Sequence, residues 1–113
     1  MNNDVPIVQK VYDFYREFYQ IYPHIPKQDR YALGEKIQQT TLDLFENLIF
    51  ASHQGKQNKM EFLSKAATKL DLLKNLLRLA EDIKAIPTKR YLALSEILQE
   101  IGRMLGGWIK SLT

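Results

Sequence analysis

The chain has 113 residues, of which 45% are hydrophobic and 26% charged, with a net charge of +3 and no cysteine. This length predicts a single domain over residues 1–113, the hydrophobic content argues against disorder, and the missing cysteines exclude disulfides, thiolate catalysis and cysteine-based zinc sites. No apolar run approaches the roughly 18 residues of a membrane span, and no basic region followed by an apolar core opens the chain. We therefore expect a cytoplasmic protein without a signal peptide and without a membrane partner.

Charge is distributed unevenly along the chain. Residues 1–53 carry five basic and seven acidic side chains, whereas residues 54–113 carry eleven basic and six acidic ones. Six of the basic residues lie between Lys56 and Arg78, where only Glu61 and Asp71 oppose them. A basic half favours an anionic partner, nucleic acid first, although an ordinary solvated helix surface explains the same count.

The first predicted helix begins near Asp4, which can cap it, and has Pro6 in its first turn. It ends at Tyr22, before two prolines. Two neighbouring stripes follow helical spacing: Val8, Tyr12, Tyr15, Tyr19 and Tyr22 in one, and Val11, Phe14, Phe18 and Ile21 in the other. Six aromatic residues between Tyr12 and Tyr22 are compatible with base stacking, but their helical spacing favours a role in the core.

The second and third predicted helices run from about Lys27 to His53 and from about Lys59 to Ala85, separated by a polar loop. Each has a regular apolar seam: Leu33, Ile37, Thr41, Leu44, Leu48 and Ala51 in one, and Leu63, Ala66, Leu70, Leu73, Leu77 and Ala80 in the other. Gly34 lies beside the first of these seams, so a neighbouring group is expected to approach closely there.

A second stripe on the third helix is cationic at its start and apolar at its end. It consists of Lys65, Lys69, Leu72, Leu76, Leu79 and Ile83. An apolar stripe outside the main seam has to be covered, either by a wide core or by another subunit. Lys74 and Arg78 fall on a different side of the helix, which we expect to face solvent.

The fourth predicted helix runs from Thr88, which we expect to cap it, to about Ser111. Its seam is formed by Tyr91, Leu94, Leu98, Ile101, Leu105 and Trp108. Gly102, Gly106 and Gly107 lie inside this helix, where each costs about 1 kcal/mol relative to alanine. Such glycines indicate either tight helix packing inside the bundle or a groove that, with Arg103, serves assembly with other chains. Glu96, Glu100 and Arg103 follow at helical spacing, so a local ion pair is expected.

Four helices with short connections predict an all-α, up-down-up-down four-helix bundle. The search for catalytic or metal-binding motifs finds none: His24 and His53 lie in loops or at helix ends, and there is no Glu-x-x-His motif, phosphate-binding loop or nucleophile elbow. The sequence therefore predicts no catalytic residue, no metal and no cofactor. A helical enzyme is the least supported class of function.

Three stretches resemble the accessory variability determinant (Avd) family of diversity-generating retroelements. They are Pro-Lys-Gln-Asp-Arg-Tyr-Ala-Leu-Gly at 26–34, residues 70–83 with Leu-Leu-Arg-Leu-Ala at 76–80, and Glu-Ile-Gly-Arg-Met-Leu-Gly-Gly-Trp at 100–108. The last is the most specific, because helical bundles rarely end a helix with this pattern. Related four-helix proteins encoded in ribosomal-RNA intervening sequences usually carry an Asn-Ile-Ala-Glu-Gly-type segment in the second helix, whereas this chain has Thr-Leu-Asp-Leu-Phe-Glu-Asn-Leu at 41–48.

The resemblance implies a four-helix bundle that assembles as a ring-like homopentamer. It implies a non-enzymatic accessory protein that binds a reverse transcriptase together with template RNA and DNA, and that supports mutagenic reverse transcription. It implies no small-molecule substrate. The alternatives are a four-helix protein–protein scaffold and an intervening-sequence protein with no retroelement role.

Two sets of candidate residues follow. We expect nucleic acid to be bound by the cations Lys65, Lys69, Lys74, Arg78, Arg90, Arg103 and Lys110. We expect an oligomer interface at Leu72, Leu76, Leu79, Ile83, Gly102, Gly106 and Trp108. The alternative for each of these cations is that it only keeps the surface soluble. Arg103 has a second alternative, a structural role as the ion-pair partner of Glu100 or Glu96.

Overall fold

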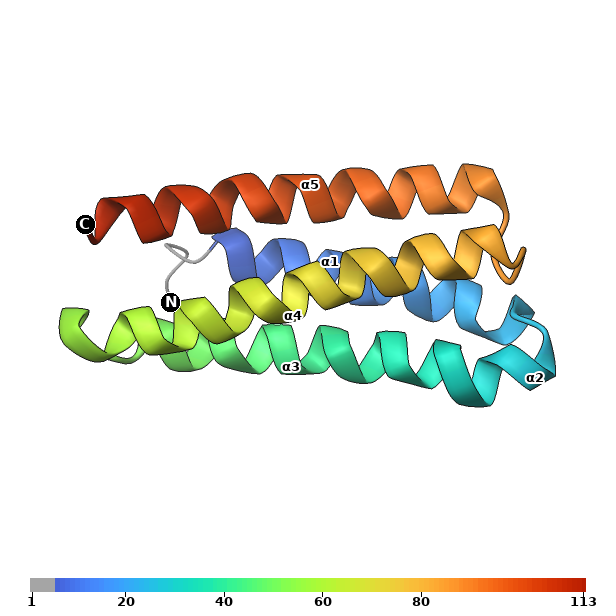
Figure 1. Ribbon diagram of the computed structural model, residues 1–113, viewed down its shortest axis with the longest axis horizontal. Coiled ribbons are helices and arrows are strands. Elements are labelled where there is room, and N and C mark those ends of the chain that lie inside the picture. The colour runs from blue at the N-terminus through green and yellow to red at the C-terminus, as the bar shows by residue number, and fades with distance from the viewer. Residues whose placement is uncertain (1–5) are drawn as a thin grey trace.

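The computed structural model describes residues 6–113 and contains four long helices, α1 (Pro6–Ile21), α3 (Glu35–Ser52), α4 (Lys56–Asp82) and α5 (Thr88–Ser111). Successive helices run in opposite directions and form a rod of 43 × 23 × 22 Å (Figure 1). No strand occurs among the described residues. The predicted all-helical bundle is therefore confirmed, whereas the predicted cap at Asp4 lies outside the described residues.

The four long helices enclose one hydrophobic core. Helix α3 packs on α4, α4 on α5, α5 on α1 and α1 on α3. The apolar seams predicted for the second, third and fourth helices face this core: most of their residues are buried, and Leu33, Tyr91 and Trp108 are partly buried against it. The regular alternation of three- and four-residue steps is therefore sufficient to identify the inward side of these helices.

The aromatic residues of α1 divide into two groups. Phe14 and Phe18 are fully buried, but Tyr12 and Tyr19 are 50% and 61% exposed. Tyr15 is half-buried between these groups. The interpretation as core was therefore wrong for Tyr12 and Tyr19, whose phenol oxygens favour contact with water, whereas Tyr22 is partly buried against the core.

The connection from α1 to α3 contains three short helical elements: η1, a 3-10 turn (Tyr22–His24), α2 (Lys27–Asp29) and η2, a π-helical turn (Arg30–Gly34). Arg30 stabilises this connection, because its guanidinium donates hydrogen bonds to the carbonyl oxygen of Pro23 at 2.9 Å and to that of Ile25 at 3.0 and 3.2 Å. The predicted close approach at Gly34 is confirmed, since a Cβ there would lie 3.1 Å from the ring of Tyr22. Arg30 thus has a structural role.

The two remaining connections are short. Helix α4 begins at Lys56, three residues earlier than predicted, and the Lys59 ammonium donates to the Ala51 carbonyl at the end of α3 with a distance of 3.0 Å. At the other end of α4, Lys84 adopts a left-handed φ of 63°, and the Ala85 amide donates back to the Ala80 carbonyl at 2.8 Å. This is the geometry of a Schellman motif at the end of a helix, in which glycine usually occupies the left-handed position.

Thr88 does not cap α5 as predicted. Pro87 occupies the cap position, and Thr88 is the first residue of the helix. The Thr88 hydroxyl instead donates to the Glu81 carboxylate at 2.9 Å. This bond ties the start of α5 to the end of α4 and helps to hold the two helices side by side.

Candidate nucleic-acid and assembly surfaces

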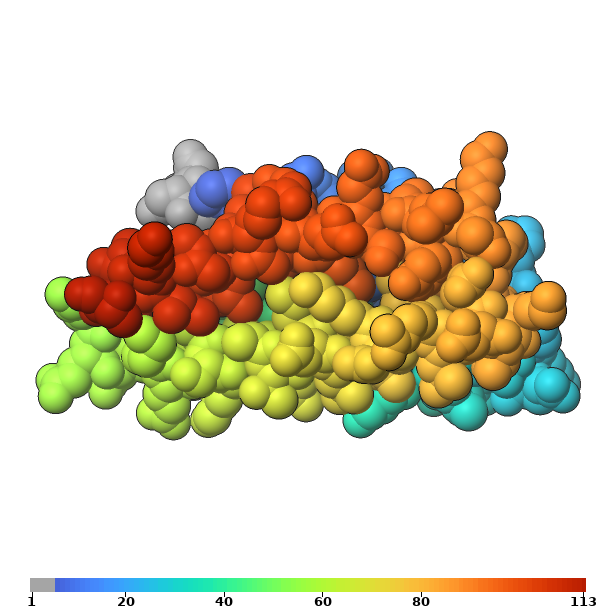
Figure 2. Space-filling model, turned by 45° about the horizontal axis from the view of Figure 1, so that its top comes forward, coloured from blue at the N-terminus to red at the C-terminus, as the bar shows by residue number. Residues whose placement is uncertain are grey.

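A groove between α4 and α5 carries two of the predicted cations. Four residues of α4 and three of α5 line it: Asp71, Lys74, Asn75, Arg78, Tyr91, Ser95 and Gln99. Both cations are exposed, as predicted, and neither forms an ion pair among residues 6–113. The two helices lie side by side across the face shown in Figure 2, α4 in yellow and α5 in orange and red. We call this surface the α4/α5 groove; it combines two positive charges and one negative charge with an aromatic ring and three uncharged polar side chains.

Three of the predicted cations are engaged within the chain. Lys65 lies 3.4 Å from the Glu61 carboxylate, Lys69 lies 3.2 Å from Asp43 of α3, and Arg103 pairs with Glu100. The expected ion pair between Arg103 and a glutamate of α5 is therefore confirmed. A cation that already has a carboxylate partner attracts a phosphate less strongly, because the two charges largely cancel at a distance.

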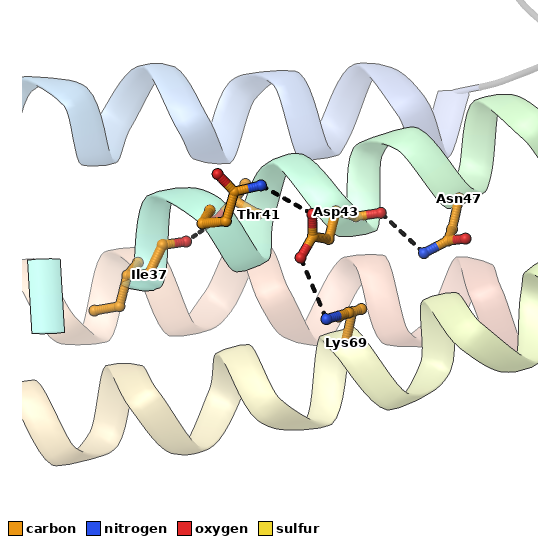
Figure 3. A network of polar contacts seen from close by, with 6 residues as sticks. Ile37, Thr41, Asp43, Asn47 and Lys69 are labelled. Carbon is orange, nitrogen blue, oxygen red and sulfur yellow. Dashed lines mark hydrogen bonds and ion pairs between the residues drawn. The ribbon is translucent and has the colours of Figure 1, made fainter. Parts of the chain in front are cut away.

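Lys69 and Asp43 form the only ion pair between two helices in the described part of the chain (Figure 3). Burial alone raises the pKa of the Asp43 carboxyl, but hydrogen bonds from Gln39 and Lys69, and the positive charge of Lys69, outweigh burial and hold that pKa below its usual value. The Asn47 amide also donates to the Asp43 carbonyl at 3.0 Å. Lys69 thus cross-links α3 and α4, and this position favours a structural role.

Arg90 and Lys110 lie at opposite ends of α5, and both are exposed. Twenty residues of helix separate them, which corresponds to about 30 Å. The seven predicted cations therefore form no single cluster: two share the α4/α5 groove, three have carboxylate partners, and two lie near the ends of one helix.

The predicted interface residues of α4 form a partly exposed apolar strip, which we call the aliphatic ridge: Leu72, Leu76, Leu79 and Ile83. Leu79 and Ile83 are 47% and 48% exposed, and the other two are partly buried. Lys69 belongs to the same helical stripe and contacts Asp43 of α3, so the ridge runs along the α3 side of α4. The four helices of one chain do not cover this strip.

The glycines of α5 leave a second part of the surface without side chains. A Cβ at Gly102 would approach only the side chains of Lys74 and Leu70, at 3.4 and 3.7 Å, and a Cβ at Gly106 or Gly107 would meet nothing within 4 Å. Tight packing inside the bundle therefore does not explain Gly106 and Gly107. Trp108 is half-buried, and the Lys59 ammonium lies 5.7 Å from the centre of its ring.

A further apolar surface, which the sequence analysis assigned to the core, lies between α1 and α3. Its walls are Tyr12, Tyr15 and Tyr19 of α1 and Leu42 and Phe45 of α3, around a hollow of about 410 Å³. We call it the tyrosine groove. The signal in the sequence was the composition of the outer stripe of the first helix, which contains four tyrosines and no phenylalanine, leucine or isoleucine.

The described residues contain no cluster of histidine and acidic side chains that could hold a metal ion. None of the helices in residues 6–113 is both long and apolar enough to cross a bilayer.

The protein is an all-helical bundle with exposed cations and partly exposed apolar strips on its surface. A family model described as bAvd-like matches residues 5–112, which is nearly the whole chain. The chain therefore belongs to the bAvd-like family, and the resemblance found in the three sequence stretches is confirmed. The comparison with curated proteins finds no match.

Proposed function

We propose that this protein is a non-enzymatic accessory subunit of a diversity-generating retroelement. It assembles into a ring of identical subunits, five by analogy with the family, and binds the reverse transcriptase together with template RNA and cDNA. Its role is to support mutagenic reverse transcription rather than to catalyse it.

The observation that carries this proposal is the family match over residues 5–112. The α4/α5 groove supports the nucleic-acid part, because exposed Lys74 and Arg78 can contact successive phosphates while Tyr91 offers a ring to an unpaired base. The aliphatic ridge and the open glycine surface at Gly106 support the assembly part, since exposed apolar strips are typical of protein contacts.

Binding of structured RNA over a series of salt concentrations tests the nucleic-acid part. We expect affinity to fall steeply with salt, because each neutralised phosphate releases counterions. The double variant Lys74→Ala/Arg78→Ala should bind more weakly, with a salt slope reduced by about 1 to 2. The matched control is Lys10→Ala/Lys27→Ala, which removes the same charge from α1 and α2.

The comparison of these two variants distinguishes a local site from net charge. Equal losses of affinity in the two double variants would show that only the overall charge of the protein matters and that the α4/α5 groove is not a nucleic-acid site. Binding that is undetectable in the unmodified protein even at low salt would favour the protein–protein scaffold. Light scattering of the unmodified protein tests the ring, and a single-subunit mass at micromolar concentration would contradict it.

A further inference from the structure

The tyrosine groove has the composition of a protein-binding surface. Tyr12 and Tyr19 are 50% and 61% exposed, and the only charged side chain among its lining residues is Arg16. Tyrosine and arginine are the residues that most often dominate the energy of protein interfaces, whose centres are poor in other charges. A strand of nucleic acid needs several cations along its path, so this groove favours a protein occupant.

The groove continues beyond its central hollow at both ends. One adjoining hollow is lined by Tyr15 and Leu42 together with the charged pair of neighbours Glu35 and Lys36. Another is lined by Leu42 and Phe45 together with the carboxylates of Asp43 and Glu46. Glu35 and Glu46 are eleven residues apart on α3, which corresponds to about 16 Å. The channel thus has the length of three turns of helix: its Glu35 end has a mixed polar lining that also includes Lys36, and the rest is mainly apolar with Glu46 near the other end.

The aliphatic ridge of α4 matches this channel in length and chemistry. Leu72 and Ile83 are also eleven residues apart, about 16 Å along the helix, and the ridge residues follow the spacing of a helix that docks in a groove. Lys69 precedes the ridge by three residues, and Lys84 follows it directly. Lys69 is already paired with Asp43 of its own chain, so Lys84 is the cation beside the ridge that can meet a carboxylate of the channel.

The charges near these surfaces leave room for new ion pairs. Glu35, Glu46 and Lys84 form no ion pair among the described residues. Within one chain the ridge cannot enter the central hollow of the groove, because this hollow is on the α1 side of α3 and the ridge is on its α4 side. Only a ridge from another molecule can fill the groove.

We infer that the tyrosine groove of one subunit receives the aliphatic ridge of the next copy of this chain. Such a contact is heterologous, because two different surfaces meet, and heterologous contacts close into rings when the rotation between subunits allows it. The inference rests on the proposed ring assembly and adds the second surface that every subunit of a ring needs. It assigns Tyr12, Tyr19 and Leu42 to the interface, opposite Leu79 and Ile83.

Two charge-introducing variants at exposed positions test the inference. Tyr19→Glu alters the groove, and Leu79→Glu alters the ridge. Leu92→Glu is the matched control, since Leu92 is 60% exposed on α5 and belongs to neither surface. Circular dichroism and thermal unfolding establish that each variant is folded, and multi-angle light scattering or native mass spectrometry gives the number of subunits.

We expect the unmodified protein and Leu92→Glu to be oligomeric, and each of the other two variants to be a single subunit. A mixture of Tyr19→Glu and Leu79→Glu should give a dimer containing one of each, because the first retains an intact ridge and the second an intact groove. No larger species should form, since the remaining two surfaces are both altered.

The results separate this inference from the proposed ring. A single-subunit mass for the unmodified protein would contradict the ring itself. If Tyr19→Glu remains oligomeric and Leu79→Glu does not, the proposed ring is still supported, but the groove is not part of the subunit interface. Single variants that dissociate but form no mixed dimer would show that groove and ridge are not partners.

Discussion

Replacing Thr40 with valine should stabilise the protein, whereas the same replacement at Thr41 should not. Both side chains are 1% exposed on neighbouring positions of α3. The Thr41 hydroxyl donates to the Ile37 carbonyl at 2.7 Å (Figure 3), but the Thr40 hydroxyl has no hydrogen-bond partner among residues 6–113. The two side chains are equally buried and lie in the same helix, so they differ only in whether the hydroxyl has a hydrogen-bond partner.

The expected magnitude follows from the cost of the unpaired hydroxyl. Burying such a group without a partner costs about 1 to 3 kcal/mol in proteins, and valine puts a methyl group in the same space. Thr40→Val should therefore raise the free energy of unfolding by about 1 to 2 kcal/mol, which corresponds to a rise in Tm of roughly 5 °C or more. Thr41→Val loses a bond worth about 1 kcal/mol and gains a buried methyl group of similar value, so its net change should stay within about 0.5 kcal/mol.

Urea unfolding followed by circular dichroism measures both variants under identical conditions. If the two shift the midpoint equally, or if Thr40→Val is less stable than the unmodified protein, the hydroxyl of Thr40 is paired in solution and the reasoning is wrong. A changed slope of the unfolding curve would indicate an altered unfolded state instead of a changed native contact.

Three further predictions concern stability. Lys84→Gly should stabilise a single subunit by about 0.5 to 1 kcal/mol, because glycine adopts a φ of 63° without strain. Since Lys84 also flanks the aliphatic ridge, Tm is compared in the Leu79→Glu background, where an unchanged or lower value would contradict this. Gly106→Ala should stabilise a single subunit by about 1 kcal/mol, whereas Gly34→Ala should not, since its Cβ would lie 3.1 Å from the Tyr22 ring. Denaturation of both variants in the Leu79→Glu background, which lacks subunit contacts, measures the two changes in the free energy of unfolding. Equal changes would contradict this prediction. Asp43→Asn should lower the free energy of unfolding by about 0.5 to 1 kcal/mol near neutral pH, because the ion pair with Lys69 is lost. Since the pKa of Asp43 is lowered in the folded state, this deficit should persist above about pH 4 and vanish as pH falls through the folded pKa. The measurement is Tm as a function of pH, and a deficit that does not change with pH would count against the ion pair.

The sequence predicted the surface residues less well than the core. Tyr12 and Phe14 lie in the same helix and both have aromatic rings, yet one is half exposed and the other fully buried. Helical spacing alone allowed either stripe of α1 to face inward, and the polar oxygen of tyrosine was the only sequence feature that separated them. The family resemblance, by contrast, was readable from three short stretches, because Gly102, Gly106 and Trp108 form an unusual pattern for a helix end.

The sequence by itself determined the four helices and the residues of α3, α4 and α5 that face the core, because the period of a helix repeats along the chain and is independent of what the helix packs on. Only the tertiary structure decided that Lys69 is paired with Asp43, that Lys74 and Arg78 share a groove with Tyr91, and that the tyrosines of α1 border an open groove. These features depend on the distance and rotation between helices that are far apart in the sequence. That arrangement is set by the packing of the whole core, and no local pattern records it.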